Sequence, residues 1–258
     1  MPRRGVIYLV SGPKSYLSEL STSLTSLRRH DPDLAVTVFS RYELPKRARC
    51  EHVLYDNEHH PLQQKVLVFA ESPYEQTLFI DTDTTILGPI APVFDRLADA
   101  NIALAHSPLL DTAHEPPRLV ALENPAEYNT GVVLYDDSAV AAAFLQRWRD
   151  AVMHQDPSDM WAGHNCDQTH FNRLVTAGAV GETGVALGTL PNVVWNVRGQ
   201  MVDEMTRRRL WSDARIFHHR TRHMKLRKAL STITDIEQVR AAAHKGAAKV
   251  RRRILHST

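Results

Sequence analysis

Cysteine is scarce in this chain of 258 residues, where only Cys50 and Cys166 occur. A disulfide framework, on which small secreted domains depend, is therefore not expected. So few cysteines fit a reducing compartment, and we expect a cytoplasmic protein.

Long apolar runs are lacking as well. The first one follows Arg3 and Arg4 and is too short for a signal-peptide core, and no stretch has the length of a membrane-spanning helix. Internal repeats and low-complexity linkers are also absent from the sequence. With 43% hydrophobic and 23% charged residues, the chain is expected to fold as a globular protein. We expect one domain over residues 1–230, followed by a basic helical tail over residues 231–258.

The net charge of +2 conceals an uneven distribution, because more than half of all Lys and Arg residues lie beyond residue 197. The tail ends in the basic run 249–255. Cations are favoured at a helix C-terminus, so this run fits a solvated helix end. It also fits a patch for a polyanionic acceptor or for anionic lipid, which would place the protein peripherally at the inner face of a membrane. Nucleic acid is not expected as a partner.

Short apolar runs alternate with helical periodicities, which predicts an α/β fold with a mostly parallel central sheet flanked by helices. The chain opens with expected strands at 6–10 and 35–39, and the leucines between them recur with the spacing of one helix face. The other expected helices are 62–70, 140–152 and 167–175, and the other expected strands are 102–105, 132–135 and 214–217, with two short strands around Pro191 within 185–197.

Residues 78–87 are the most informative stretch, because a buried apolar strand ends there in Asp81 and Asp83, with only Thr82 between them. Residues i and i+2 of a strand point to the same side, so both carboxylates are expected to face one spot. Without a cation they would repel each other, and hard oxygen ligands suit Mg²⁺ or Mn²⁺. The alternative is a loop in which one aspartate caps a helix and the other is solvated.

Three later segments carry residues that suit the same kind of site. Asn129 and Gly131 open the expected strand 132–135, where glycine allows close approach of a ligand to the backbone. Asp167 and Gln168 begin a helix, at the end where free N–H groups collect. The basic and histidine-rich segment 218–225 offers a third metal ligand and cations for phosphate.

In this order, the motifs resemble those of the nucleotide-sugar-dependent glycosyltransferases of the GT-A fold. The sequence is most similar to the retaining family 8, which includes glycogenin and bacterial lipopolysaccharide galactosyltransferases. The resemblance runs from about residue 5 to residue 226. It implies a single Rossmann-like GT-A domain that transfers a sugar from a nucleoside diphosphate sugar, of the UDP class, to an acceptor hydroxyl of a glycan, a lipid-linked glycan or a protein.

The resemblance also implies roles for individual residues. It implies a Mn²⁺ or Mg²⁺ ion held by Asp81, Asp83 and His219, with His218 and His223 as alternatives to the histidine. The implied catalytic residues are Gln168 and Asp167, and the implied donor-binding residues are Ser11, Gly12, Tyr16, Lys65, Thr82, Asn129, Gly131 and Lys225. Tyr16 fits an ordinary residue of an amphipathic helix equally well. The chain departs from the family in its last motif, where Arg222 replaces a glycine and Leu226-Arg227 replace Pro-Trp.

Retention of the anomeric configuration is expected from Gln168. An inverting transferase needs a carboxylate base that deprotonates the acceptor. Glutamine is no base at neutral pH, and the neighbouring Asp167 does not share its helix face.

Two rival functions remain from the sequence. In a phosphatase of the haloacid dehalogenase type, Asp81 would be the nucleophile, Asp83 the acid/base, and Asp136-Asp137 the later acid pair. That chemistry needs a lysine between these motifs, and the sequence has no lysine between Asp83 and Lys225, so Arg118 would have to substitute. The second rival is a catalytically inactive protein that only binds nucleotide sugars.

Overall fold

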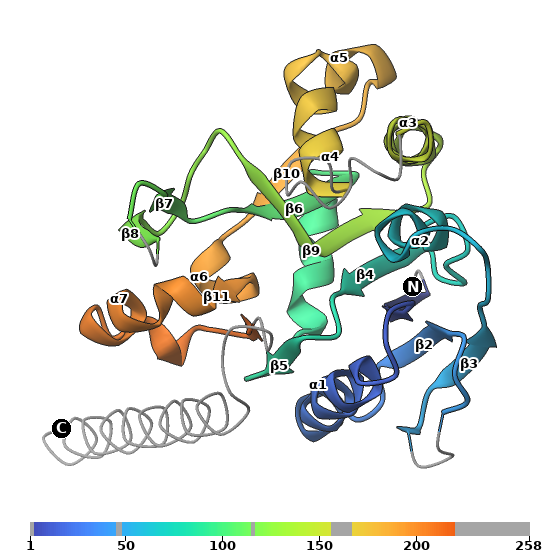
Figure 1. Cartoon of the computed structure of the whole chain (residues 1–258), viewed down its shortest axis with the longest axis horizontal. Helices are drawn as coiled ribbons and strands as arrows, with labels where there is room; N and C mark the ends of the chain where they lie inside the picture. Colours follow the sequence, from blue (N-terminus) through green and yellow to red (C-terminus); the bar gives the residue numbers. More distant parts are fainter. Residues whose placement is uncertain (1–2, 45–47, 115–116, 156–166, 220–258) are drawn as a thin grey trace, which may run out of the picture.

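The structure is a computed structural model that describes residues 3–44, 48–114, 117–155 and 167–219. The expected fold class is confirmed, because a seven-stranded sheet forms the centre of the molecule in the order β10-β6-β9-β4-β1-β2-β3 (Figure 1). All of its strands are parallel except β9, which is antiparallel to both of its neighbours. The strands are β1 (Arg4–Val10), β2 (Ala35–Ser40), β3 (Glu51–Leu54), β4 (Gln76–Ile80), β6 (Ile102–His106), β9 (Tyr128–Asp136) and β10 (Leu187–Leu190).

Helices cover both faces of this sheet, which explains why its central strands contain the continuous apolar runs 6–10, 78–80 and 132–135. Successive residues of β1 point to opposite faces of the sheet, so Tyr8 packs in the core cluster on one face and Ile7 in the core cluster on the other. The Tyr8 side is covered by α1 (Tyr16–His30) and the 3₁₀ helix η2 (Ala91–Ala98). The Ile7 side is covered by α2 (Pro61–Val68), α3 (Ala139–Met153) and α4 (Asp167–Thr176).

A second, three-stranded sheet lies beside the carboxyl end of β4 (Figure 1). It is formed by β5 (Thr84–Ile86), β11 (Val197–Arg198) and β12 (Ile216–His218). β12 pairs antiparallel with β5, with His218 opposite Thr84, and this pairing carries His218 to the turn that holds Asp81 and Asp83. The remaining elements are the strands β7 (Leu109–Asp111) and β8 (Arg118–Ala121) and the helices α5 (Ala179–Thr183), α6 (Asn192–Trp195), η4 (Gly199–Met201), α7 (Val202–Arg207) and η5 (Leu210–Ser212).

The expectation of two short strands around Pro191 is only partly met. β10 ends just before this proline, but the helical turn α6 follows it, with the Trp195 N–H donating to the Pro191 carbonyl at 2.9 Å. The later strand, β11, has two residues. A proline that fixes its own φ suits the start of a helical turn, which explains why strand structure is interrupted here.

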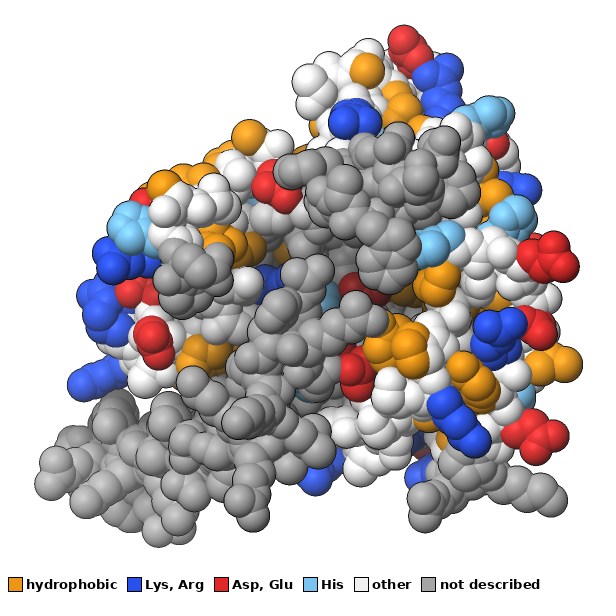
Figure 2. All heavy atoms as spheres, viewed as in Figure 1, with side chains coloured by type: hydrophobic (Ala, Val, Ile, Leu, Met, Phe, Trp, Pro, Cys, Tyr) orange, Lys and Arg blue, Asp and Glu red, His pale blue; other side chains and the backbone are white. Residues whose placement is uncertain are grey.

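The described surface carries charges of both signs. On the face shown in Figure 2, Lys and Arg side chains alternate with Asp and Glu side chains around the rim. None of the helices in the described part of the chain combines the length and the apolar character that a bilayer-spanning segment requires. Most of the basic residues beyond residue 197, and the whole expected tail 231–258, lie outside the described residues, so the domain boundary near residue 230 stays a prediction.

Candidate metal and sugar site

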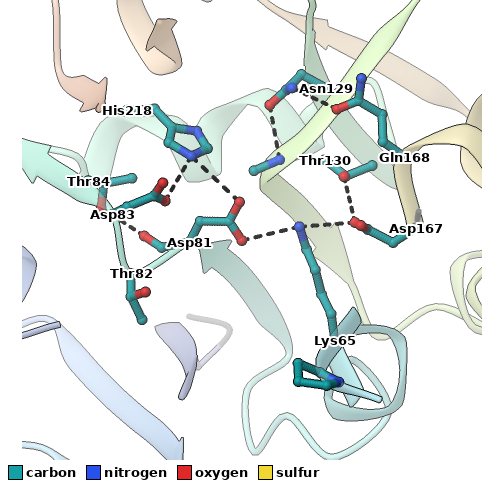
Figure 3. A network of polar contacts seen from close by, with 12 residues as sticks. Lys65, Asp81, Thr82, Asp83, Thr84, Asn129, Thr130, Asp167, Gln168 and His218 are labelled. Atoms are coloured by element: carbon teal, nitrogen blue, oxygen red, sulfur yellow. Dashed lines mark hydrogen bonds and ion pairs between the residues drawn. The ribbon is translucent and has the colours of Figure 1, made fainter. Parts of the chain in front are cut away.

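Asp81 and Asp83 lie in the turn between β4 and β5, at the carboxyl edge of the central sheet. Their side chains retain 29% and 20% exposure. His218 Nε2 lies 2.9 Å from Asp83 Oδ1 and 3.7 Å from Asp81 Oδ2 (Figure 3). One ligand atom of each residue lies within 4.8 Å of those of the other two. Two carboxylates and an imidazole at this spacing fit a divalent ion such as Mn²⁺ or Mg²⁺.

The histidine of this cluster is His218, one of the two alternatives to His219, which the resemblance implied as the third ligand. His219 directly follows β12 and turns away, because successive residues of an extended chain face opposite sides. Its Nε2 lies 3.0 Å from Thr85 Oγ1, and its backbone N–H donates to the Asp83 carbonyl at 2.9 Å. His219 thus stabilises the turn through its backbone and its contact with Thr85. His223, the other alternative, lies outside the described residues.

Lys65 connects the acidic turn to α4. Its Nζ lies 3.1 Å from Asp81 Oδ1 and 3.0 Å from Asp167 Oδ2 (Figure 3). Lys65 is 8% exposed and Asp167 4% exposed, so the ion pair between them is buried. Asp167 also accepts a hydrogen bond of 2.6 Å from the Thr130 hydroxyl. Burial alone would lower the pKa of Lys65, but Asp167 and Asp81 outweigh burial and raise it above the ordinary value.

The two aspartates of the turn respond differently to their surroundings. Burial raises the pKa of Asp81, and Lys65 and His218 offset only part of that shift. Burial also tends to raise the pKa of Asp83, but the charge of His218 and its hydrogen bond prevail and lower it to about 2. Asp83 is therefore the more firmly held anion, and Asp81 is the carboxylate that gains most from a further cation nearby.

Gly131, in the first half of β9, lies against the cluster. A Cβ atom at this position would overlap His218 Cε1 and would lie 2.6 Å from His218 Nδ1 and 3.0 Å from Asp81 Oδ2. Glycine at 131 therefore lets the imidazole approach the sheet closely enough to reach the carboxylates.

Gly131→Ala is expected to displace His218 and to weaken Mn²⁺ binding about tenfold or more. We also expect a loss of about 1–3 kcal/mol in the free energy of unfolding, the usual cost of overpacking. Urea unfolding and calorimetric titration with Mn²⁺ would measure both. Gly181→Ala is the matched control, because no atom lies within 4 Å of a Cβ built at that position. Equal Mn²⁺ affinity of the Gly131 variant and the wild type would contradict this account.

Asn129 is the centre of a polar network beside the cluster. Its Oδ1 accepts from the Gly131 N–H at 3.1 Å, from Asn196 Nδ2 at 2.7 Å and from Arg198 Nη1 at 3.0 Å. Its Nδ2 donates to Gln168 Oε1 at 2.7 Å (Figure 3). These contacts join the start of β9 to α4 and to the second sheet.

Gln168 is held at both ends of its carboxamide. While Oε1 accepts from Asn129, Nε2 donates to Glu127 Oε1 at 2.5 Å and to Ser107 Oγ at 3.3 Å. The amide is thus oriented with its oxygen toward Asn129 and its nitrogen toward the carboxylate of Glu127.

The structure brings together most of the residues that the sequence singled out: Lys65, Asp81, Asp83, Asn129, Gly131, Asp167 and Gln168 meet at one edge of the sheet (Figure 3). Asn196, Arg198 and Glu127 were not singled out. Polar residues at 196 and 198, two apart at the end of an apolar segment, were the available signal for the first two.

The other expected donor-binding residues are placed as follows. Ser11 and Gly12 follow β1, which runs parallel to β4, so they lie at the same edge of the sheet as the acidic turn. The Tyr16 ring packs directly on Gly12. Thr82 faces α1, with its hydroxyl 3.4 Å from Glu19 Oε2. Lys225 lies outside the described residues, and the roles of these residues stay predictions.

The phosphatase alternative requires Asp136 and Asp137 beside Asp81, and the structure separates them. Asp136 pairs with Gln76 at the start of β4, whereas Asp81 follows the end of that strand. The Asp136 carboxylate accepts from the Ser138 N–H at 3.1 Å, at the beginning of α3. The acid pair of that mechanism therefore cannot form here.

No protein-family model matches the sequence, and no curated protein sequence matches it either. Solved structures do match. Two structures of the glycosyltransferase GlyE of Streptococcus pneumoniae TIGR4 superpose with TM-scores of 0.54 and 0.58, at 14% and 13% identity, over 95% of this chain and 64% of theirs. This chain thus spans less than two thirds of the length of the pneumococcal glycosyltransferase.

This chain covers almost the whole length of two further solved structures. A glycosyltransferase involved in the glycosylation of the major capsid of PBCV-1 has a TM-score of 0.52 at 13% identity, over 84% of this chain and 93% of its own. Galactosyltransferase LgtC, solved with donor and acceptor sugar analogues, has a TM-score of 0.50 at 14% identity, over 92% of this chain and 95% of its own. Identities this low show the fold alone. The chain therefore has the GT-A-type fold of these glycosyltransferases.

Proposed function

We propose that this chain is a metal-dependent glycosyltransferase that moves a sugar from a nucleoside diphosphate sugar, of the UDP class, to an acceptor hydroxyl with retention of configuration. The observation that carries the proposal is the cluster of Asp81, Asp83 and His218 on a fold shared with glycosyltransferases. A cytoplasmic location, with residues 231–258 touching an anionic membrane at its inner face, is part of the proposal.

Asp81, Asp83 and His218 would hold Mn²⁺ or Mg²⁺. When bound, such an ion acts as a Lewis acid that offsets the charge developing on the departing diphosphate. Asp83 would meet the ion as a carboxylate, since the charge and hydrogen bond of His218 lower its pKa to about 2 before an ion binds. Lys225 is proposed to place a second cation against the same phosphates.

The sugar would lie between α2, α4 and the start of β9. Lys65, Asn129 and Asp167 supply a cation, an amide and a carboxylate there, which suit a ring of hydroxyl groups. Asp167 and Lys65 are oriented by their own buried ion pair, and Thr130 holds the carboxylate. Gln168 would lie near the anomeric carbon, with its carboxamide fixed by Asn129 and Glu127.

Retention follows from the chemistry of Gln168. A glutamine cannot take the proton of the acceptor. A reaction on one face of the sugar would instead let the leaving phosphate oxygen accept that proton. Glu127 accepts hydrogen bonds from Gln168 and Ser107, which supports a role in holding the amide and not in taking the acceptor proton.

A screen of nucleotide sugars by thermal shift, with and without Mn²⁺, tests the function. We expect stabilisation only with Mn²⁺, of about 2.7 kcal/mol at a hundredfold excess over Kd, or roughly 5–10 °C in Tm. Slow Mn²⁺-dependent hydrolysis of the same donor, without acceptor, would separate an enzyme from an inactive binding protein.

Proton NMR of the first sugar product would then report the stereochemistry. An α-linked donor should give an α-linked first product. A β-linked product would overturn retention and make Glu127 the candidate base. Preference for simple phosphomonoesters over nucleotide sugars would overturn the transferase proposal itself.

A further inference from the structure

The acidic turn and β5 pack against α1 through polar side chains, although the same helix face also buries leucines in the core (Figure 1). Three side chains of α1 contact this segment and lie three or four positions apart, on one side of the helix: Glu19, Ser23 and Ser26. Their partners are alternate residues of the turn and of β5: Thr82, Thr84 and Ile86. Buried polar groups are costly unless they are hydrogen-bonded, so this polar contact calls for a specific role.

The middle contact belongs to a hydroxyl chain formed by Tyr8, Ser23 and Thr84, each of which is 0% exposed. Tyr8 Oη lies 2.9 Å from Ser23 Oγ, and Ser23 Oγ lies 2.8 Å from Thr84 Oγ1. Thr84 Oγ1 lies 3.0 Å from the carbonyl oxygen of Asp81 (Figure 3). The hydroxyl chain therefore runs from β1 through α1 to the backbone of the acidic turn.

The direction of these hydrogen bonds follows from the carbonyl group at the end of the hydroxyl chain. A carbonyl oxygen only accepts, so the Thr84 hydroxyl must donate its one proton to Asp81. Thr84 Oγ1 then accepts from Ser23, and Ser23 Oγ accepts from Tyr8. Burial raises the pKa of Tyr8, so its hydroxyl keeps the proton that it donates. Ser23 and Thr84 thus each donate once and accept once, and every bond points toward the acidic turn.

The backbone of Asp81 is held on both sides of its Cα atom. Its N–H donates to the Gly131 carbonyl at 2.9 Å, and its carbonyl accepts from Thr84. The side chain leaves the backbone between these two groups. Fixing both of them therefore fixes the direction in which the Asp81 carboxylate points.

We propose that Thr84 and Ser23 are positioning residues, which hold the backbone of Asp81 so that its carboxylate faces Asp83 and His218. The inference rests on the proposed ion site, and it gives the hydroxyl chain a role in ion affinity beyond its contribution to stability. Neither positioning residue belongs to the cluster of ligand atoms, so both act through the carbonyl of Asp81.

Two substitutions at Thr84 separate its hydroxyl from its packing. Thr84→Val keeps the size and shape of the side chain but leaves the Asp81 carbonyl without its donor. The affinity of the full chain for Mn²⁺ alone should fall about tenfold, the lower end of the usual cost of changing an outer contact of a metal site. Thr84→Ser keeps the hydroxyl and should restore most of the affinity.

Ser23→Ala tests the hydroxyl chain from the helix. The Thr84 hydroxyl then keeps its acceptor but loses its donor, so Mn²⁺ affinity should fall only about twofold to fivefold. Calorimetric titration with Mn²⁺ would measure these affinities, and urea unfolding would measure the accompanying loss of stability.

Ser26→Ala is the matched control. Ser26 is another buried serine on the same side of α1, and its Oγ accepts from the Ile86 N–H at 2.9 Å. Its loss also removes a buried hydrogen bond between α1 and β5, so the urea midpoint should fall about as much as in Ser23→Ala. Mn²⁺ affinity should stay at the wild-type value, because the Asp81 carbonyl keeps its donor.

Hydrogen exchange of the Asp81 N–H in the metal-free chain reports on the turn without any ion. This N–H is bonded to the Gly131 carbonyl, so its exchange measures local opening of the turn. Thr84→Val should accelerate this exchange by more than the fall in global stability accounts for. Ser26→Ala should accelerate it only as far as global stability falls.

The outcomes distinguish the positioning role from the proposed function. Wild-type Mn²⁺ affinity in Thr84→Val, or an equal loss in Ser26→Ala, would overturn the positioning role. If Thr84→Ser fails to restore the affinity, the hydroxyl is not the relevant group and the role is overturned as well. A wild-type chain that binds no Mn²⁺, although Thr84→Val opens the turn, would overturn the proposed metal-dependent function instead.

Discussion

Asp83→Asn is expected to abolish Mn²⁺-dependent binding of UDP while the fold remains intact. Of the two carboxylates of the turn, that of Asp83 lies closer to His218 Nε2 and is the one whose pKa is lowered to about 2. Changes to outer residues of metal sites already cost 10–100-fold in affinity, so loss of a ligand should cost at least about a hundredfold. Calorimetric titration of UDP with and without Mn²⁺ would measure the loss.

The control for this change is Asp203→Asn, which removes a carboxylate from the exposed surface of α7. It should leave the Mn²⁺-dependent affinity unchanged. If the Asp83 variant still binds UDP as tightly as the wild type in Mn²⁺, the acidic turn does not hold the ion and the proposed mechanism fails.

Lys65→Met should lower the free energy of unfolding by about 3 kcal/mol, the lower end of the cost of removing one partner of a buried ion pair. Asp167, 4% exposed, would remain as a buried carboxylate without its cation. Asp81 keeps 29% of its side-chain surface exposed and can be hydrated in part, which limits the total. Urea unfolding followed by circular dichroism would measure the difference.

The second variant of this test also removes the unpaired carboxylate of Asp167. Lys65→Met combined with Asp167→Asn should recover part of the lost stability, because the buried carboxylate is then gone. Lys14→Met, at an exposed lysine, should have no measurable effect. A Lys65→Met protein as stable as the wild type would show that the ammonium is not required by the two carboxylates.

The sequence predicted most strands of the central sheet and most of the residues that meet at its edge, because burial leaves a readable pattern. Strands covered on both faces read as continuous apolar runs, so a polar residue that ends such a run marks the edge of the sheet. Asp81 and Asp83 follow the end of β4, and Asn129 is the second residue of β9. Because β9 is antiparallel, its start lies at the same edge as the end of β4, and the two polar turns meet.

The choice between His218 and His219 could not be made from the sequence. Adjacent strand residues exchange faces when the register shifts by one, and the register of β12 is set by its pairing with β5. Both histidines suit a buried strand end equally well. Only the alignment of His218 with Thr84, between segments far apart in the sequence, decides which imidazole meets the carboxylates.

Asn196 was not predicted from the sequence as a site residue, for a different reason. The segment 192–198 contains a helical turn followed by a strand of two residues, so neither periodicity extends far enough to assign a face. β3 was missed because its four residues are exposed or only partly buried, which leaves no apolar run to detect. Short elements whose side chains are specified by distant partners give no local signal.

The origin of the three proposed ligands has a consequence for how the molecule holds together. Two come from the turn after β4 in the first third of the chain, and the third comes from β12, the last described strand. β12 pairs with the short β5 and not with a strand of the central sheet, and its Ile216 packs in the core cluster on one side of that sheet. A divalent ion bound by all three would act as a cross-link that closes a loop of about half the chain, and it would oppose detachment of the small sheet from the large one. Binding of the ion would then be coupled to the docking of the chain's later segment as well as to the handling of phosphate.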